Sequence, residues 1–468
     1  MPQNNKETKS LPSVRQSRAA RAAVEFSDEA IALYVAECYA GTLHYVNMTG
    51  QWFYFDNVRH RVEITLRVTD LIREVCREKA LQARSMRKFG LAMEIASARK
   101  VSAVERLVRA DRKIAATIDQ FDRDRLLLNT PGKTIDFRTG RSRPNRAEDF
   151  ITKQTAVAPN NDGCPLWLAF LERVVPDAQT RRYLQMAAGY STTGLTNEHA
   201  MFFLYGTGAN GKSVFLNTLI GVMGDYAVTA PMETFTSSQN DRHPTELARL
   251  VGARLVVANE TEEGRRWAEN RIKAVTAGDR VAARLMRRDF FEFDPEFKLW
   301  VAGNHKPGLR GVDEGIRRRM NLIPFIVTIP AEERDEQLFE KLKGEWPGIL
   351  QWMIEGAFDE LGEGLTAPEV VRRATDDYLN EEDSLGQWLG ECCKCGDNFY
   401  SSSTELYRSW RSYAEKAGEF IRSQKRFSAA LRDRGFIPRR AGGTGRAGFI
   451  GISIVTPEPE TPEEGTQS

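Results

Sequence analysis

The sequence lacks any apolar run approaching the roughly 20 residues that a membrane-spanning helix needs. Its first residues, MPQNNKETKS, also lack the apolar core of a signal peptide. These two absences argue against an integral membrane protein and against export. We therefore expect the protein to remain in the cytoplasm in which it is made.

Cysteine is scarce, and a charge excess of one sign is missing. The six cysteines include one cluster, Cys392, Cys393 and Cys395, with no second ligand pair at zinc-finger spacing. This pattern predicts free thiols rather than a disulfide framework or a zinc site. The 66 basic and 64 acidic side chains nearly cancel, so any basic surface for nucleic acid must be local.

The first third of the chain is predicted to be a small α+β domain that follows a basic arm. A helix is expected near 28–40, and an aromatic hairpin turns at Thr49-Gly50. A basic helical stretch covers 72–113, and a second hairpin turns at 129–132. The basic stretch is more typical of a solvated helix face than of a DNA site.

The middle of the chain alternates strand and helix patterns up to about residue 325, as a three-layer α/β domain does. A phosphate-loop pattern lies between the apolar strand 200–205 and the helix 214–223. It consists of Gly206, Thr207, Gly208, Ala209, Asn210, Gly211, Lys212 and Ser213. In such a loop, backbone N–H groups and Lys212 bind the phosphates of ATP, and the Ser213 hydroxyl coordinates Mg²⁺. The strand–loop–helix setting argues against a chance glycine-rich loop.

Polar side chains follow two further buried strands. Glu260 ends the strand 254–259 and is the candidate acid for Mg²⁺ and the attacking water, with Glu262 as the fallback. Asn304 follows the strand 297–303 and could orient that water or sense the γ-phosphate. The basic run 317–319 could supply an arginine finger, although a charge run is usually a solvated face.

In order and spacing these motifs resemble the superfamily-three helicases, in particular the phage and plasmid primase–helicase branch that includes the poxvirus primase–helicase. The resemblance implies an α/β P-loop (AAA+-like) helicase motor. It assigns Lys212 and Ser213 to Walker A, Glu260 to Walker B, Asn304 to the sensor and Arg318 to the arginine finger. One departure is that Asn259 precedes Glu260 where many relatives have paired acids, which leaves Glu260 and Glu262 both open.

The family's additional motif corresponds here to Lys273, Asp279 and Arg284. A DNA-contacting hairpin is expected to follow it near 286–293, with Arg287 and Arg288 at its tip. By this resemblance, Lys273, Arg284, Arg287 and Arg288 are the expected DNA-binding residues of the motor.

The resemblance also implies a domain order. It predicts a disordered basic arm (1–24), an N-terminal α+β domain (25–158), a helical collar (159–195), the P-loop ATPase domain (196–362), a winged-helix-like DNA-binding module (380–456) and an acidic disordered tail (457–468). The module was expected to contain two helices and a glycine-rich hairpin, with cations and aromatics such as Trp410 near DNA or in the core.

These observations predict an ATP-dependent DNA helicase, most simply a homohexamer, that unwinds duplex DNA in phage or plasmid replication in a bacterial host. Primer synthesis is not expected from this chain, because a polymerising domain is replaced by a short arm, so a separate primase or replisome protein is an expected partner. The alternative is an ATP-regulated origin-binding initiator or loader without strong unwinding activity. A phosphotransferase is disfavoured because the sequence contains no recognisable binding pocket for a small-molecule phosphate acceptor.

Overall fold

The computed structural model describes residues 25–237, 245–259, 265–284, 290–309, 312–418, 421, 423–440 and 447–455. It divides into two compact units, Met1–Ala158 and Pro159–Ser468. The six cysteines are free thiols, as predicted. Within the described ranges, no helix combines the length and apolar character that crossing a membrane requires.

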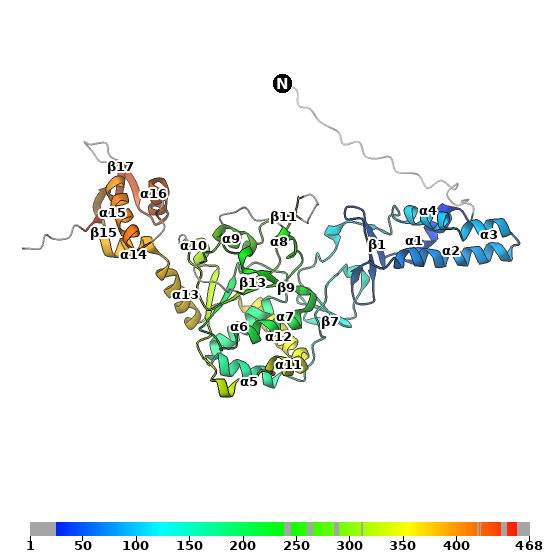
Figure 1. Cartoon of the computed structure of the whole chain (residues 1–468), viewed down its shortest axis with the longest axis horizontal. Coiled ribbons are helices and arrows are strands. Elements are labelled where there is room, and N and C mark those ends of the chain that lie inside the picture. The colour runs from blue at the N-terminus through cyan, green and yellow to red at the C-terminus, as the bar shows by residue number, and fades with distance from the viewer. Residues whose placement is uncertain are drawn as a thin grey trace, which may run out of the picture. The chain divides into compact units, whose positions relative to one another are not determined.

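In its described residues, 25–158, the first unit combines four α-helices with two small sheets (Figure 1). The helices are α1 (Asp28–Cys38), α2 (Arg67–Ser85), α3 (Phe89–Ile95) and α4 (Ala98–Val108). The first sheet, in the order β3-β2-β1-β4, contains β1 (Leu43–Val46), β2 (Gln51–Phe55), β3 (His60–Val62) and β4 (Ala115–Ala116). The second, in the order β5-β6-β7, contains β5 (Leu127–Thr130), β6 (Lys133–Asp136) and β7 (Arg141–Arg143).

Both predicted hairpins are present in this unit. The turns after β1 and β5 contain Gly50 and Gly132 at φ 69° and 83°, a left-handed conformation that glycine adopts without a Cβ penalty. The predicted basic stretch is three helices rather than one, and it begins earlier, at Arg67. Some of its apolar positions, such as Ile72 and Val104, are fully buried, so the stretch has a buried face on which these helices pack together.

The second unit is built on a five-stranded parallel sheet in the order β14-β8-β13-β10-β9. Its strands are β8 (Met201–Tyr205), β9 (Ala227–Pro231), β10 (Leu255–Asn259), β13 (Lys298–Gly303) and β14 (Met320–Pro324). Successive residues such as Phe202 and Phe203 point to opposite faces of the sheet, and both are fully buried. Burial on both faces explains why these strands are almost continuously apolar.

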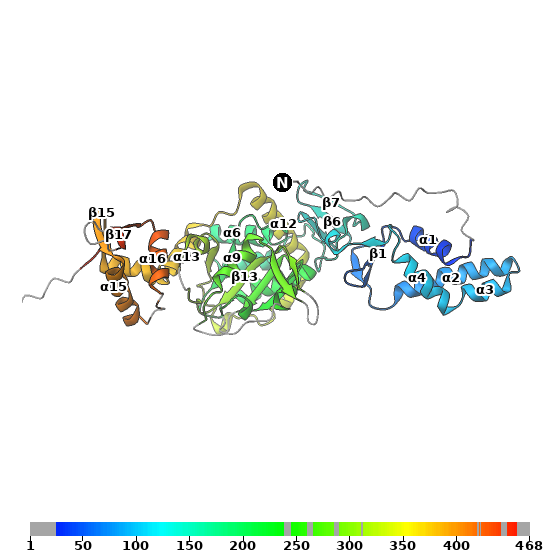
Figure 2. The ribbon, with the colours of Figure 1, turned by 90° about the horizontal axis from the view of Figure 1, so that it is seen from above.

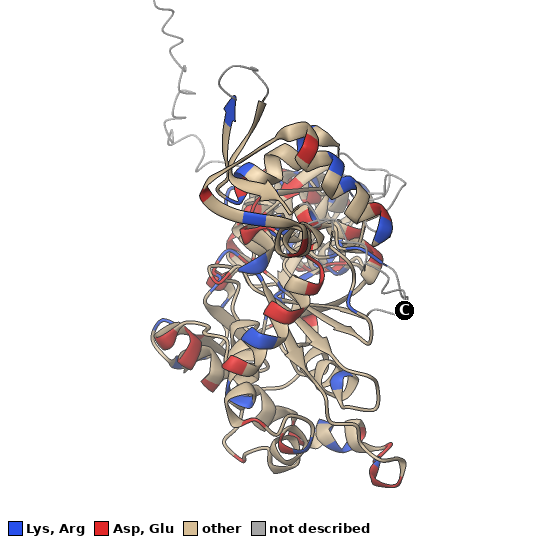
Figure 3. Ribbon diagram, turned by 90° about the vertical axis from the view of Figure 1, so that its left-hand side faces the viewer, with Lys and Arg blue, Asp and Glu red and all other residues tan. Residues whose placement is uncertain are grey.

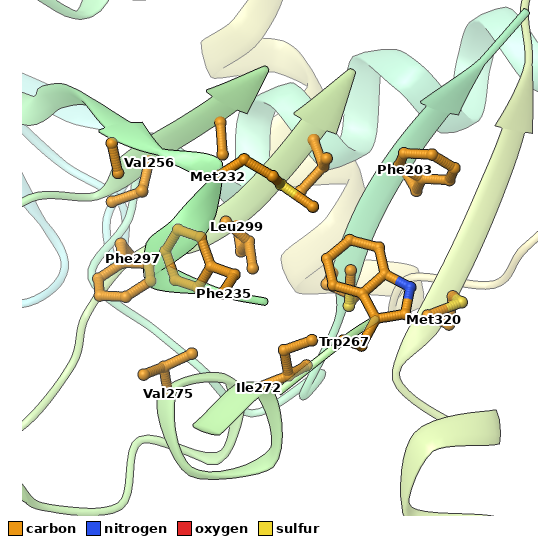
Figure 4. Close-up of a cluster of buried hydrophobic side chains, with 14 of the residues drawn as sticks. Phe203, Met232, Phe235, Val256, Trp267, Ile272, Val275, Phe297, Leu299 and Met320 are labelled. Carbon is orange, nitrogen blue, oxygen red and sulfur yellow. The ribbon is translucent and has the colours of Figure 1, made fainter. Parts of the chain in front are cut away.

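Helices cover both faces of this sheet (Figures 1 and 2). They are α5 (Pro165–Val174), α6 (Ala178–Tyr190), α7 (Lys212–Met223), α8 (Thr245–Ala248), α9 (Glu269–Ala277), α10 (Glu314–Arg317), α11 (Leu338–Leu342), α12 (Trp346–Glu363) and α13 (Glu369–Glu381). On one face, Phe215 of α7 stacks on Trp167 of α5 at 5.5 Å between ring centroids and lies 5.8 Å from Trp300 of β13. On the other, Ile272 of α9 joins a cluster with Phe203 (Figure 4).

Helices α6 and α12 approach closely because glycines line their crossing. A Cβ built on Gly189 would lie 2.1 Å from the backbone nitrogen of Ala357, and one on Gly356 would lie 2.2 Å from the carbonyl oxygen of Gln185. Neither position has room for a side chain. The backbones of α6 and α12 therefore pack directly against each other at this crossing.

The C-terminal part of this unit places three helices on a three-stranded antiparallel sheet in the order β15-β17-β16. Its elements are α14 (Ser384–Cys392), β15 (Cys393–Ser402), α15 (Ser403–Lys416), α16 (Gln424–Asp433), β16 (Ile437–Arg440) and β17 (Ala447–Ile454). Sequence analysis missed α14 and β15, because β15 is mostly exposed and carries little apolar pattern. Trp410 and Phe427 are fully buried here, so of the two alternatives for the aromatics of this module, Trp410 takes the core position.

Candidate functional site

The loop between β8 and α7 has a backbone that few sequences could adopt. Gly208, Ala209 and Gly211 have φ values of 104°, 48° and 85°. A Cβ on Gly206 would lie 2.1 Å from the carbonyl oxygen of Phe325. The glycines of the phosphate-loop pattern are therefore required by the geometry of the loop, which turns the chain from the end of β8 into the first turn of α7.

Lys212 is folded back over this loop. Its Nζ donates hydrogen bonds to the carbonyl oxygen of Gly206 at 2.6 Å, to Oδ1 of Asn210 at 3.1 Å and to Oδ1 of Asn304 at 3.1 Å. Burial lowers the pKa of its ammonium group. No described carboxylate pairs with this ammonium, so its partners are neutral dipoles that an anionic oxygen could replace.

Asn210 connects the loop to a neighbouring strand. It is 3% exposed, and its Nδ2 donates to the carbonyl oxygen of Phe325, just after β14, at 2.8 Å. The backbone N–H of Ile329 donates to the carbonyl oxygen of Ala209 at 2.8 Å. Thr207, Ala209 and Ser213 are exposed, so Ser213 is accessible at the N-terminal turn of α7.

Asn304 reaches Lys212 because of the sheet register. Gly303 of β13 lies opposite Tyr205 of β8, so the residues that follow these strands emerge together at the carboxyl edge. On the next strand, Asn259 lies opposite Ala302, so β10 ends at the same edge. The acid candidates Glu260 and Glu262, which follow β10, lie outside the described residues.

Arg318 lies at the other edge of the sheet. It follows α10 and precedes β14, whose first residue Met320 pairs with Met201, the first residue of β8. Since a strand rises about 3.3 Å per residue, β14 separates this edge from the carboxyl edge by about 13 Å. Arg318 therefore follows Asn304 in the sequence but lies at the opposite edge of the sheet.

The three arginines of the basic run differ in their surroundings. Arg317 pairs with Asp376 at 2.9 Å. Arg319 is 6% exposed, with Nε donating to Oγ1 of Thr276 at 3.1 Å and Nη1 to the carbonyl oxygen of Gly315 at 2.7 Å. Arg318 is exposed, and its side chain makes no hydrogen bond or ion pair to the residues that the structure describes. Of the three, Arg318 is the one available to a partner.

The expected DNA-contacting residues fall into two groups. Lys273, on α9, forms an ion pair with Asp313, the N-cap of α10, so it has a structural partner. Arg284 ends β11 (Val281–Arg284) opposite Phe290 of β12 (Phe290–Phe293), with its guanidinium 5.1 Å from that ring. An antiparallel pair is therefore present, and its first strand lies before the predicted range 286–293. Its tip, with Arg287 and Arg288, lies outside the described residues.

Sequence analysis missed helix α13, whose Tyr378 contacts the loop that follows Asn304. The Tyr378 hydroxyl donates to the carbonyl oxygen of Pro307. The signal was available, because Val371, Tyr378 and Leu379 follow a helical period and are buried.

Two family models match the chain. Residues 32–176 match the family described as D5 N terminal like, and residues 204–319 match a family of unknown function, DUF5906. The second range contains the phosphate loop together with Asn304 and Arg318.

Three viral proteins named as putative helicases are similar to the chain. The protein of Acanthamoeba polyphaga mimivirus is 24% identical over 63% of this chain and 33% of its own length. That of Frog virus 3 is 27% identical over 53% and 27%, and that of Sputnik virophage 28% identical over 31% and 20%. The chain thus matches about a third or less of these relatives.

Solved structures of the NrS-1 C-terminal region are also similar to the chain. One aligns over 90% of this chain and 98% of its own, with a TM-score of 0.46 and 10% identity. Another aligns over 91% and 99%, with a TM-score of 0.47 and 9% identity.

Proposed function

Because this chain is a primase–helicase-like protein of the phage and viral type, we propose that it is an ATP-dependent DNA helicase of superfamily three. The observation that carries the proposal is the joining of Lys212, in the phosphate loop, to Asn304 at the carboxyl edge of a parallel sheet. Ligands of open α/β sheets bind at this edge. The relatives' helicase names agree with the same conclusion.

ATP and Mg²⁺ fit the residues present. The loop 206–211 and the first turn of α7 present backbone N–H groups to phosphate, and the Lys212 ammonium has only neutral partners among the described residues to give up. The exposed Ser213 hydroxyl would ligate Mg²⁺, together with Glu260 from the end of β10. Asn304 would then lose its hydrogen bond from Lys212 and bind the γ-phosphate or the attacking water instead.

The position of Arg318 favours a ring. An arginine at the amino edge of the sheet is separated from its own phosphate loop by the length of β14. It could stabilise a transferring phosphoryl group only in a neighbouring copy. We therefore propose a homo-oligomeric ring, most simply a hexamer, with nucleotide sites completed between subunits.

We propose that the C-terminal helices and sheet form a winged-helix-like module that binds DNA. Basic residues of α16 and β16 are exposed, namely Lys425, Arg426, Arg432, Arg439 and Arg440. Basic and acidic positions are otherwise interspersed along the ribbon (Figure 3), so this cationic group is local. A DNA-binding module of this kind is equally compatible with the alternative function, an ATP-regulated initiator or loader.

Unwinding of a forked duplex tests the proposal against this alternative. We expect the purified protein to separate the strands of a forked DNA when ATP and Mg²⁺ are present, and not when the ATP is replaced by a non-hydrolysable analogue. DNA-stimulated ATP hydrolysis without strand separation would support the initiator or loader. Hydrolysis indifferent to DNA would contradict both functions.

Replacing Glu260 with glutamine should preserve ATP binding and block hydrolysis. The amide keeps the shape of the side chain but loses the charge that holds Mg²⁺ and the basicity that activates water, a loss of about 10² or more in kcat. Nucleotide affinity and steady-state turnover measure the two effects. The matched variant is Glu262→Gln, and the assignment is wrong if that change, rather than Glu260→Gln, blocks turnover.

Replacing both Arg287 and Arg288 with alanine should reduce unwinding but leave DNA-independent ATP hydrolysis nearly intact. The strands β11 and β12 form a two-stranded sheet of their own, and we propose that Arg287 and Arg288, which lie between them in the sequence, contact phosphates of the DNA. The salt dependence of DNA binding should fall in slope by about 1 to 2. Lys341 and Lys343, exposed lysines paired with Asp335 and Glu340, provide the matched double variant. Equal unwinding by both double variants would remove the hairpin from the DNA path.

A further inference from the structure

The loop that follows Asn304 is held by the C-terminal end of α13. The buried Tyr378 hydroxyl donates to the carbonyl oxygen of Pro307 and accepts a hydrogen bond from Nε1 of Trp267 at 3.0 Å. Glu382 accepts a hydrogen bond from the backbone N–H of Leu309 at 2.7 Å. Lys306 pairs with Glu381 at 3.1 Å. Residues 306–309 thus have polar contacts to three residues at this helix end.

The loop after Asn304 is also hydrogen-bonded to the segment that begins at Arg265, after β10. The backbone N–H of Trp267 donates to the carbonyl oxygen of Gly308 at 3.0 Å, and that of Gly308 donates to the carbonyl oxygen of Arg265 at 2.8 Å. Trp267 is itself set in the motor core beside Phe203, at 5.9 Å between ring centroids (Figure 4). Tyr378 therefore clamps together the loops that follow β10 and β13, the two strands that end beside the nucleotide site.

Asp383, which follows Glu382 in the chain, contacts the C-terminal helices. Asp383 is the N-cap of α14, where its carboxylate accepts from the backbone N–H of Gly386 at 3.1 Å. It also forms an ion pair with Arg434, the C-cap of α16. Two consecutive carboxylates, Glu382 and Asp383, therefore hold the loop after Asn304 and the end of α16 respectively.

We infer that residues 378–383, at the C-terminal end of α13, transmit movement between the nucleotide site and the C-terminal module. We call these residues the relay. Tyr378 is a positioning residue in this relay and touches no reacting atom. When the loop after Asn304 shifts with the γ-phosphate, the clamp moves α13, and Asp383 passes the movement to α16. The inference rests on the proposed function, since it takes the loop to respond to ATP and α16 to bind DNA.

Two conservative variants test the relay from its two ends. Tyr378→Phe removes only the hydroxyl that joins Pro307 and Trp267. Asp383→Asn keeps an N-cap side chain for α14 but weakens the pairing with Arg434. The control is Tyr183→Phe, because Tyr183 is equally buried and its hydroxyl has no hydrogen-bond partner among the described residues.

We expect Tyr378→Phe and Asp383→Asn to lower DNA-stimulated kcat by about tenfold, with the KM for ATP within about twofold of wild type. Tyr183→Phe should leave both values unchanged. A loss in Tyr378→Phe alone would show that the clamp acts only within the nucleotide site, and would overturn the relay. So would wild-type stimulation in both variants.

Hydrogen exchange over residues 369–392 supplies a readout that does not need turnover. Addition of MgATP should change protection there in wild type and in Tyr183→Phe, but not in Tyr378→Phe. Bound MgATP without any such change in wild type would overturn the relay. A wild-type protein that binds but does not hydrolyse ATP would refute the proposed function instead, and the exchange measurement would still decide the relay.

Discussion

Replacing Lys212 with alanine is expected to abolish ATP hydrolysis and unwinding while the fold remains intact. The ammonium is the only charge on the phosphate loop, and it is buried against Gly206, Asn210 and Asn304. Its removal takes away the point charge on the β- and γ-phosphates but leaves the backbone cradle, whose shape depends on the glycines. We expect kcat to fall by about 10² to 10³ or more.

Steady-state hydrolysis with and without DNA measures this effect, and thermal unfolding shows whether the fold survives. Lys341→Ala is the matched control, because Lys341 is an exposed lysine of α11 paired with Asp335 at 2.6 Å. Wild-type turnover in Lys212→Ala would mean that the phosphate loop does not serve this chemistry, and the proposed function would fail with it.

Replacing Arg318 with alanine is expected to permit ATP binding and to prevent hydrolysis. An arginine finger can contribute about 10³ to 10⁵ in rate, which corresponds to about 4 to 7 kcal/mol. Stability should barely change, since the Arg318 side chain is exposed and has no partner among the described residues. Arg319→Ala is the informative contrast, because it removes buried hydrogen bonds to Thr276 and Gly315 and should lower the unfolding temperature.

Mixing the two inactive variants decides whether Arg318 acts across a subunit boundary. In a mixed ring, some interfaces pair the intact Lys212 of one copy with the intact Arg318 of its neighbour. Partial recovery of ATP hydrolysis is therefore expected. If rings shown by mass measurement to be mixed recover no activity, Arg318 is not a finger in trans, and its position at the amino edge also excludes its own phosphate loop.

The strand–loop–helix setting of the phosphate-loop pattern could be predicted from the sequence because it depends on neighbouring residues. An apolar strand, a glycine-rich octapeptide and an apolar-periodic helix follow one another directly, and the structure places them as β8, the loop and α7. The hairpins were readable for the same reason, since their turns and strands are contiguous. The chain segment of each feature contains all the information that defines it.

Only the tertiary structure could decide which of these features meet. Asn304 reaches Lys212 because β13 lies beside β8 in the sheet order, although 92 residues separate them in the chain. Arg318 lies at the opposite edge because β14 runs parallel to β8, so a residue before one strand cannot lie beside a loop after the other. Tyr378 acquires its partners because α13 packs on the loops that follow β10 and β13. Strand order and helix packing are set by burial summed over the whole core, and no local pattern encodes that sum.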